Sequence, residues 1–133
     1  MTASVPSAGY PILIVDDEPL LRDILAEALS DYSVHTASDG RTALALMEEQ
    51  SFDLVITDLM MPDVSGFDVL RTAQALERSV DVVVVTGYLS VEYENKCRQL
   101  GCRAILSKPF DVTEVRDEVR RCLEDKLRDQ PVE

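Results

Sequence analysis

The sequence predicts a doubly wound α/β fold, in which a five-stranded parallel sheet with five helices is covered on both faces. Two observations lead to this prediction. Apolar runs of strand length recur along the chain, and segments with apolar residues at helical spacing lie between them. Five alternating strand and helix units require right-handed crossovers, which distribute the helices over both faces of one sheet.

Four of the predicted strands are continuous apolar runs, a pattern typical of strands that are covered on both faces. They are Ile12–Val15, Leu54–Thr57, Val82–Thr86 and Ala104–Ser107. We expect all four to be central strands. The fifth predicted strand, Tyr32–Ala37, is more polar and alternates, which indicates a position nearer an edge of the sheet.

Helical spacing of apolar residues marks the segments between the strands. The first helix begins near Pro19, because proline is favoured in a first helical turn, and Leu21, Ile24 and Leu25 follow at helical spacing. The apolar positions of three further helices are Ala43, Leu46 and Met47; Phe67, Leu70 and Ala73; and Val112, Val115, Val119 and Cys122. The segment Val91–Leu100 is a weaker helix, because polar residues and Tyr93 interrupt its few apolar positions, so we expect it to be the least firmly held element.

Composition limits the classes of function. The chain has 133 residues, enough for one domain with a single core. Its 25 acidic and 13 basic residues give a net charge of −12, which disfavours direct binding of nucleic acid or of anionic membranes. Three cysteines without a CxxC pair do not suggest a disulfide framework, so a reducing, cytoplasmic location is expected.

The predicted domain organisation is simple. Residues 1–9 are expected to form a flexible tail, because they carry neither the basic start nor the apolar run of a secretory signal. Residues 10–127 form the predicted domain, and residues 128–133 a polar C-terminal tail. The sequence leaves open whether the domain acts alone or belongs to a longer regulator with an output domain.

Polar residues follow the apolar runs at the point where ligands bind in doubly wound sheets, beyond the carboxyl ends of the strands. Asp16, Asp17 and Glu18 follow the first run, and Asp58 follows the run at Leu54–Thr57. Further polar residues at strand ends are Thr86 and Lys108. If these ends converge, carboxylates, one hydroxyl and one ammonium share a single crevice.

Clustered carboxylates repel one another unless a cation compensates them, and Mg²⁺, or Mn²⁺ in its place, prefers such oxygen ligands. Asp17 and Asp58 are the first candidates for direct ligands, with Asp16 acting through water. One carboxylate can also be the nucleophile in phosphoryl transfer when positive charge balances the incoming oxygens, and Lys108 would supply part of that charge. The hydroxyl of Thr86 could bind another phosphoryl oxygen and so sense its arrival.

Four motifs, in this order and at this spacing, resemble the receiver domains of bacterial two-component response regulators, of the chemotaxis-regulator type. They are Ile12-Leu13-Ile14-Val15-Asp16-Asp17-Glu18-Pro19, Asp58-Leu59-Met60-Met61-Pro62-Asp63 with Gly66, Thr86-Gly87, and Lys108-Pro109-Phe110. The resemblance spans about residues 10–123 and implies the flavodoxin-like strand order 2-1-3-4-5.

The resemblance also implies a role for each residue of the set: phosphoacceptor for Asp58, acidic pocket for Asp16 and Asp17, third metal ligand for the backbone carbonyl of Met60, switch hydroxyl for Thr86, and phosphate-contacting cation for Lys108. The donor would be a phosphohistidine on a sensor histidine kinase, or a small phosphodonor. The domain would promote its own phosphorylation and slow hydrolysis, as a signalling module and not as an enzyme with a separate substrate. A downstream protein, an output domain or a second copy would bind through the face formed by residues 91–123. The Lys108–Pro109 bond is expected to be cis, as in relatives.

One position departs from the family pattern. Relatives often carry Tyr or Phe three residues before the lysine, where this chain has Ile105. No aromatic ring is therefore present at that switch position, and its role would fall either to Ile105 itself or to Tyr88, two residues after Thr86.

Several alternatives accompany this interpretation. Asp16, Asp17 and Glu18 could merely cap a helix, and Thr86 could be an ordinary strand residue. A phosphatase of the haloacid-dehalogenase type would also use an aspartyl nucleophile, but it usually carries a second aspartate where this chain has Met60. A degenerate receiver that only binds proteins is a third possibility. Met60 and Met61 are expected to be packing residues, and Gly66 is expected to start a helix or turn.

Overall fold

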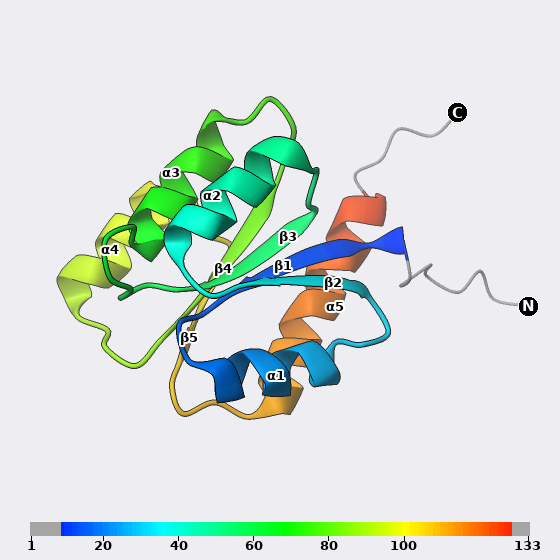
Figure 1. Cartoon of the computed structure of the whole chain (residues 1–133), viewed down its shortest axis with the longest axis horizontal. Helices are drawn as coiled ribbons and strands as arrows, with labels where there is room; N and C mark the ends of the chain where they lie inside the picture. The colour runs from blue at the N-terminus through cyan, green and yellow to red at the C-terminus, as the bar shows by residue number, and fades with distance from the viewer. Residues whose placement is uncertain (1–8, 129–133) are drawn as a thin grey trace, which may run out of the picture.

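A computed structural model describes residues 9–128 of the chain. One parallel sheet in the order β2-β1-β3-β4-β5 lies between two layers of helices (Figure 1). The elements are β1 Pro11–Val15, α1 Pro19–Ala28, β2 Ser33–Ala37, α2 Gly40–Glu49, β3 Leu54–Asp58, α3 Gly66–Ala75, β4 Asp81–Thr86, α4 Val91–Gln99, β5 Ala104–Ser107 and α5 Val112–Arg128. The predicted fold class and strand order are confirmed.

The sheet separates two apolar cores, because successive side chains of a strand point to opposite faces. Leu13 and Val55 contribute to the core beneath α2, α3 and α4. Ile12 and Ile14 contribute to the core beneath α1 and α5 (Figure 1). The central strands are thus covered on both faces, which explains why their sequences are continuously apolar.

The two edge strands differ from each other in sequence. β2 lies at one edge, as predicted from its polar and alternating pattern. The prediction that Ala104–Ser107 is a central strand is wrong, since β5 lies at the other edge, beside β4. Its residues are nevertheless apolar because Ile105 packs against one core while Leu106 packs against the other.

The helix α4 is bound to the domain by few buried side chains. Among its residues Cys97 is the buried one, whereas Val91 is 75% exposed. Ser90 caps the helix by accepting a hydrogen bond from the backbone N–H of Tyr93 at 3.1 Å. The sequence suggests that Tyr93 interrupts the apolar face of this helix. This is wrong, because the ring of Tyr93 is partly buried and packs against the core.

The predicted tails lie mainly outside the described residues, which exclude 1–8 and 129–133. At the inner margins Tyr10 is buried, and α5 continues to Arg128. Cys122 is buried in the core as predicted. Within residues 9–128, no helix combines the length and apolar character needed to cross a membrane.

The start of α3 lies directly against the end of β3. Gly66 opens α3, as predicted, and its backbone N–H donates a hydrogen bond to the carbonyl of Leu59 at 2.9 Å. A Cβ atom at Gly66 would lie 2.4 Å from the carbonyl oxygen of Asp58. This close approach requires glycine, since no larger residue fits without moving the backbone that carries Asp58.

We therefore expect Gly66→Ala to destabilise the domain by about 1–3 kcal/mol, the usual penalty of overpacking. Gly9→Ala is the matched control, because a Cβ atom there would meet nothing within 4 Å. Denaturant unfolding of the two variants measures the difference. Equal free energies of unfolding would show that the contact between α3 and β3 tolerates a methyl group.

Candidate functional site

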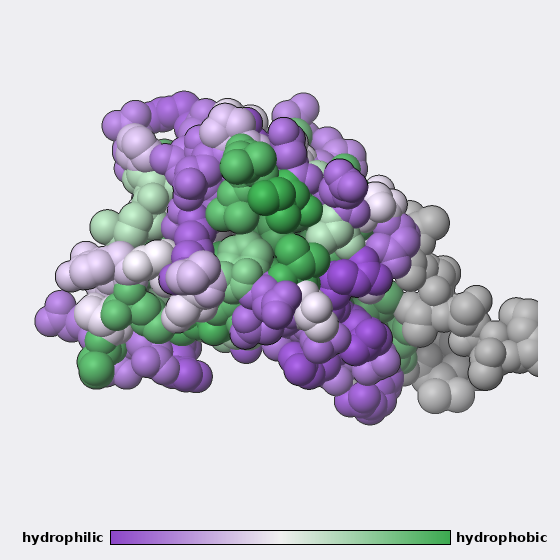
Figure 2. All heavy atoms as spheres, turned by 90° about the horizontal axis from the view of Figure 1, so that it is seen from below, coloured by the Kyte–Doolittle hydropathy of each residue, from purple (hydrophilic) through white to green (hydrophobic). Residues whose placement is uncertain are grey.

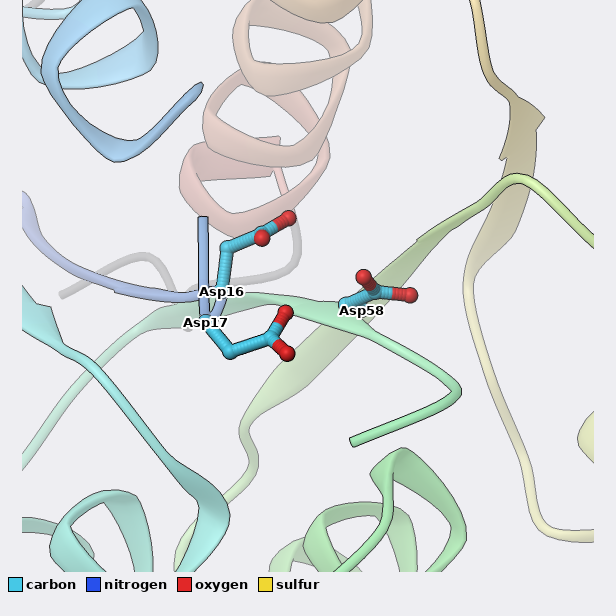
Figure 3. A group of neighbouring side chains, drawn as sticks. All are labelled: Asp16, Asp17 and Asp58. Atoms are coloured by element: carbon cyan, nitrogen blue, oxygen red, sulfur yellow. The ribbon is translucent and has the colours of Figure 1, made fainter. Parts of the chain in front are cut away.

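Three aspartates meet at the carboxyl edge of the sheet. Asp16 follows β1 and Asp58 ends the neighbouring strand β3, while Asp17 extends from the loop toward both (Figure 3). One oxygen from each carboxylate lies within 4.8 Å of the others. Asp16 and Asp58 are buried, with exposed fractions of 2% and 7%, whereas Asp17 is exposed.

Backbone contacts hold Asp16 in position. Its side chain accepts a hydrogen bond from the N–H of Glu18 at 2.9 Å, and its own N–H donates to the carbonyl of Ala37 at 3.2 Å. The guanidinium of Arg22 donates to the Asp16 carbonyl at 2.7 Å. The acidic loop is thus more than a helix cap, because Glu18 occupies the N-cap position of α1 without a side-chain capping bond.

Lys108 directs its ammonium into the acidic cluster from the end of β5. Nζ donates hydrogen bonds to Asp58 Oδ2 at 2.8 Å, Asp16 Oδ2 at 3.1 Å and Glu18 Oε1 at 3.2 Å. The backbone N–H of Lys108 donates to the carbonyl of Thr86 at 2.8 Å, and the Lys108–Pro109 bond is cis, as expected. Sequence reasoning foresaw the convergence with Asp16 and Asp58 but missed Glu18 as a partner.

Burial and ion pairing act in opposite directions on these groups. Burial raises the pKa of Asp16, while hydrogen bonds from the Glu18 N–H and from Lys108 lower it less strongly. For Lys108, burial lowers the pKa, but hydrogen bonds to Asp58 and Asp16 outweigh that effect and raise it above its ordinary value. The ammonium therefore remains charged beside Asp58 at neutral pH.

The hydroxyl of Thr86 lies at the end of β4, one residue beyond the position paired with Asp58. Thr86 is buried, and its Oγ1 donates to the carbonyl of Tyr88 at 3.1 Å. The same oxygen accepts from the N–H of Tyr88 at 3.2 Å. The ring of Tyr88 is 61% exposed and meets Tyr93 edge-on, with ring centroids 5.6 Å apart.

The remaining predicted site residues have simpler surroundings. The N–H of Met60 donates to Asp58 Oδ1 at 3.3 Å, and its side chain is 48% exposed. The prediction that Met60 is a packing residue is therefore wrong, whereas Met61 is buried as expected. Ile105 is partly buried and purely aliphatic, so it offers no polar atom to a switch.

The arrangement suits the chemistry of phosphate. Three carboxylates within 4.8 Å form an oxygen-rich position for a hard divalent cation. An ammonium beside Asp58 and a buried hydroxyl on the next strand can contact the oxygens of a group bound to that carboxylate. The site therefore combines a nucleophile with the charges that phosphoryl transfer requires.

Comparison with known proteins identifies the class. Residues 12–120 match the family described as "Response regulator receiver domain". Over 114 residues, the chain is 31% identical to the sporulation initiation phosphotransferase F of Bacillus subtilis, covering 84% of this chain and 92% of that protein. The chain belongs to the response regulator receiver family and is a phosphoacceptor domain of two-component signalling.

Solved structures agree with this assignment. A CheY-like receiver domain protein from Methanospirillum hungatei superposes with a TM-score of 0.87 at 27% identity, covering 92% of this chain and 99% of that one. The receiver domain of a sensor histidine kinase from Pseudomonas aeruginosa, solved with magnesium in its active-site cleft, has a TM-score of 0.78 at 28% identity, covering 88% and 99%. The haloacid-dehalogenase alternative gains no support. The match to the receiver family includes Asp58, and Met60 stands where those phosphatases usually carry the aspartate.

Several other curated relatives are longer, and the chain spans between 10% and 50% of their length. The receiver domain therefore occurs in regulators and sensor kinases of different overall composition. The activities of those longer proteins do not transfer with the domain.

Lys108→Gln tests the electrostatic role of the ammonium. In metal-free buffer at pH 7 it should lower the free energy of unfolding by about 1–3 kcal/mol, because two buried carboxylates lose their cationic partner. Arg98→Gln is the control, since it breaks the exposed pair with Glu94, in which Arg98 is 67% exposed, and should cost less than about 1 kcal/mol. Chemical denaturation of both variants measures the two free energies of unfolding. Equal losses of stability in Lys108→Gln and Arg98→Gln would contradict the electrostatic role of Lys108.

Proposed function

We propose that Asp58 is the phosphoacceptor of this receiver domain. The observation that supports this most is the contact between Lys108 Nζ and Asp58 Oδ2 at 2.8 Å, with two further carboxylates within 4.8 Å of Asp58. A carboxylate oxygen of Asp58 attacks the phosphorus of the donor and forms an acyl phosphate. The bond between phosphorus and the donor nitrogen breaks, and the leaving imidazole keeps its electron pair.

The chain's own residues orient this step. Lys108 stabilises negative charge on the phosphoryl oxygens, because it already contacts the acceptor carboxylate. The hydroxyl of Thr86 donates to another phosphoryl oxygen once it releases the Tyr88 carbonyl. Autophosphorylation from small donors and slow hydrolysis of the acyl phosphate follow from the same groups, which makes the domain a signalling module with intrinsic chemistry.

The three carboxylates fit Mg²⁺, or Mn²⁺ in its place. Asp17 and Asp58 would hold the ion directly, Asp16 through water, and the carbonyl of Met60 would complete the protein's share of the ligands. Support comes from the oxygen-only donor set and from the magnesium in the Pseudomonas aeruginosa receiver domain. When bound, the ion neutralises the acidic cluster and draws charge from the phosphoryl oxygens.

The phosphodonor we propose is a phosphohistidine of a sensor histidine kinase. An apolar hollow of about 400 Å³ adjoins the site, lined by Leu20, Leu21, Ile24, Glu18, Lys108, Pro109, Phe110 and Val112. Figure 2 shows an apolar area over the face that carries α1 and the start of α5. Leu20 is 73% exposed there, so a partner that covers this surface would bring its reactive side chain beside Lys108.

For output we propose the face formed by residues 91–123, which binds a downstream protein, an output domain or a second copy of the chain. The exposed side chain of Val91, the first residue of α4, and those of Tyr88 and Leu89 shortly before it support this choice. The net charge of −12 argues against direct contact with nucleic acid or an anionic membrane. Free thiols at Cys97, Cys102 and Cys122 suit the reducing cytoplasm.

We place the domain at residues 10–127 with tails on either side.

The direct test of the acceptor is intact-mass measurement after treatment with phosphoramidate and Mg²⁺. Wild type should gain one phosphoryl group, and Asp58→Asn should gain none, because its amide cannot attack phosphorus. Asp63→Asn, in the following loop, is the control and should react like wild type. No added mass on wild type, or equal addition to Asp58→Asn, would refute the assignment.

Metal binding can be tested separately by calorimetric titration with Mg²⁺. Asp17→Asn should weaken binding by at least about ten-fold, since loss of a direct ligand is no milder than loss of a supporting contact. Asp23→Asn, an exposed aspartate on α1, should leave the affinity unchanged. Wild-type affinity in Asp17→Asn would exclude this residue from the metal site.

A further inference from the structure

A row of three aromatic rings joins the turn after β4 to the start of α3. Tyr88 meets Tyr93 with ring centroids 5.6 Å apart and planes at 75°. Tyr93 in turn meets Phe67 at 5.6 Å and 72°, and Lys96 Nζ lies 4.3 Å from the centroid of the Phe67 ring. Such edge-to-face pairs are attractive beyond the area that they bury.

Both ends of this row are attached to the phosphorylation site. At one end the backbone of Tyr88 is hydrogen-bonded to the Thr86 hydroxyl in both directions. At the other end Phe67 follows Gly66, whose N–H donates to the Leu59 carbonyl and which leaves no room for a Cβ atom beside the Asp58 carbonyl. The three rings therefore connect the turn at Thr86 with the start of α3, which lies against the end of β3 at Asp58.

The Thr86 hydroxyl has one proton, and this proton now goes to the carbonyl of Tyr88. A hydrogen bond from Thr86 to a phosphoryl oxygen on Asp58 would use the same proton, so the two bonds exclude each other. Phosphorylation must therefore release the Tyr88 carbonyl from Thr86, while the bond that the Thr86 oxygen accepts from the Tyr88 N–H can remain. The backbone of Tyr88, whose ring meets Tyr93, then keeps only one of its two hydrogen bonds to Thr86.

We propose that Tyr88, Tyr93 and Phe67 form an aromatic latch that holds the turn after β4 and α4 in the unphosphorylated arrangement and opens when Thr86 turns to the phosphoryl group. The latch rests on the proposed role of Asp58 as acceptor. It supplies an aromatic coupling in a chain whose position 105 is the aliphatic Ile105, and it makes Tyr93 a positioning residue for the switch. α4 follows, because Tyr93 lies in its first turn.

A latch that favours the unphosphorylated arrangement opposes binding of a phosphoryl group. Removing the ring of Tyr93 should therefore raise the affinity for beryllium fluoride, a phosphoryl mimic, in the presence of Mg²⁺. The expected gain is about two- to ten-fold, the range that corresponds to the loss of one aromatic pair. Tyr93→Phe keeps both ring contacts and should bind like wild type.

The matched control is Tyr32→Leu. Tyr32 is also partly buried and forms an edge-to-face pair with Tyr10, at 5.9 Å and 61°, at the other end of the sheet. Loss of this ring should lower stability to a similar extent without changing affinity for the mimic. A purely structural role for Tyr93 predicts that Tyr93→Leu and Tyr32→Leu behave alike.

The experiment titrates beryllium fluoride, with Mg²⁺ fixed, into the full chain and its variants and follows binding by ¹⁹F NMR. Tighter binding by Tyr93→Leu alone supports the latch. Equal affinity of Tyr93→Leu, Tyr32→Leu and wild type overturns the latch and leaves the acceptor role intact. Absence of binding to wild type overturns both. If Tyr93→Leu does not fold, Tyr88→Leu replaces it, because that ring is 61% exposed and its removal leaves the core in place.

Discussion

The site depends on one electrostatic balance, between the ammonium of Lys108 and the carboxylates of Asp16 and Asp58. Two buried carboxylates so close together would each favour the protonated form if they stood alone. Lys108 contacts both, at 3.1 Å and 2.8 Å, and so offsets part of their negative charge. The positive charge thus lies beside the Asp58 carboxylate before any further group binds there.

The parallel sheet makes this balance possible. Asp16, Asp58, Thr86 and Lys108 lie at or just beyond the carboxyl ends of β1, β3, β4 and β5. The strand order brings these ends side by side although residues 16 and 108 are far apart in sequence. The absence of a Cβ atom at Gly66 lets the start of α3 lie directly against the Asp58 carbonyl, where the chain leaves the sheet.

The sequence predicted the fold and the convergence well because both follow from strongly periodic signals. Buried strands are continuously apolar, and polar residues directly after them in a doubly wound sheet point to one edge. β5 was misjudged because a short edge strand that packs against both cores is as apolar as a central one. Periodicity describes burial and does not report the number of neighbouring strands.

Side-chain contacts were less predictable. The sequence predicts that Met60 packs, but Met60 is 48% exposed, and its N–H donates to the side chain of Asp58. The sequence also does not predict that Glu18 contacts Lys108 or that the ring of Tyr93 packs against the core. Both depend on where a neighbouring element lies in space, which local spacing does not encode. The aromatic row through Tyr93 is visible only once α3 and α4 are side by side.

In the proposed site, one cation and the ammonium of Lys108 share the hollow in which the three aspartates meet. A crystal structure with Mn²⁺, located by its anomalous signal, tests this most directly. We expect a single strong peak in contact with Asp17 and Asp58, with Nζ of Lys108 facing it across the carboxylate of Asp58. A peak elsewhere, or a Lys108 side chain turned to solvent, would contradict it.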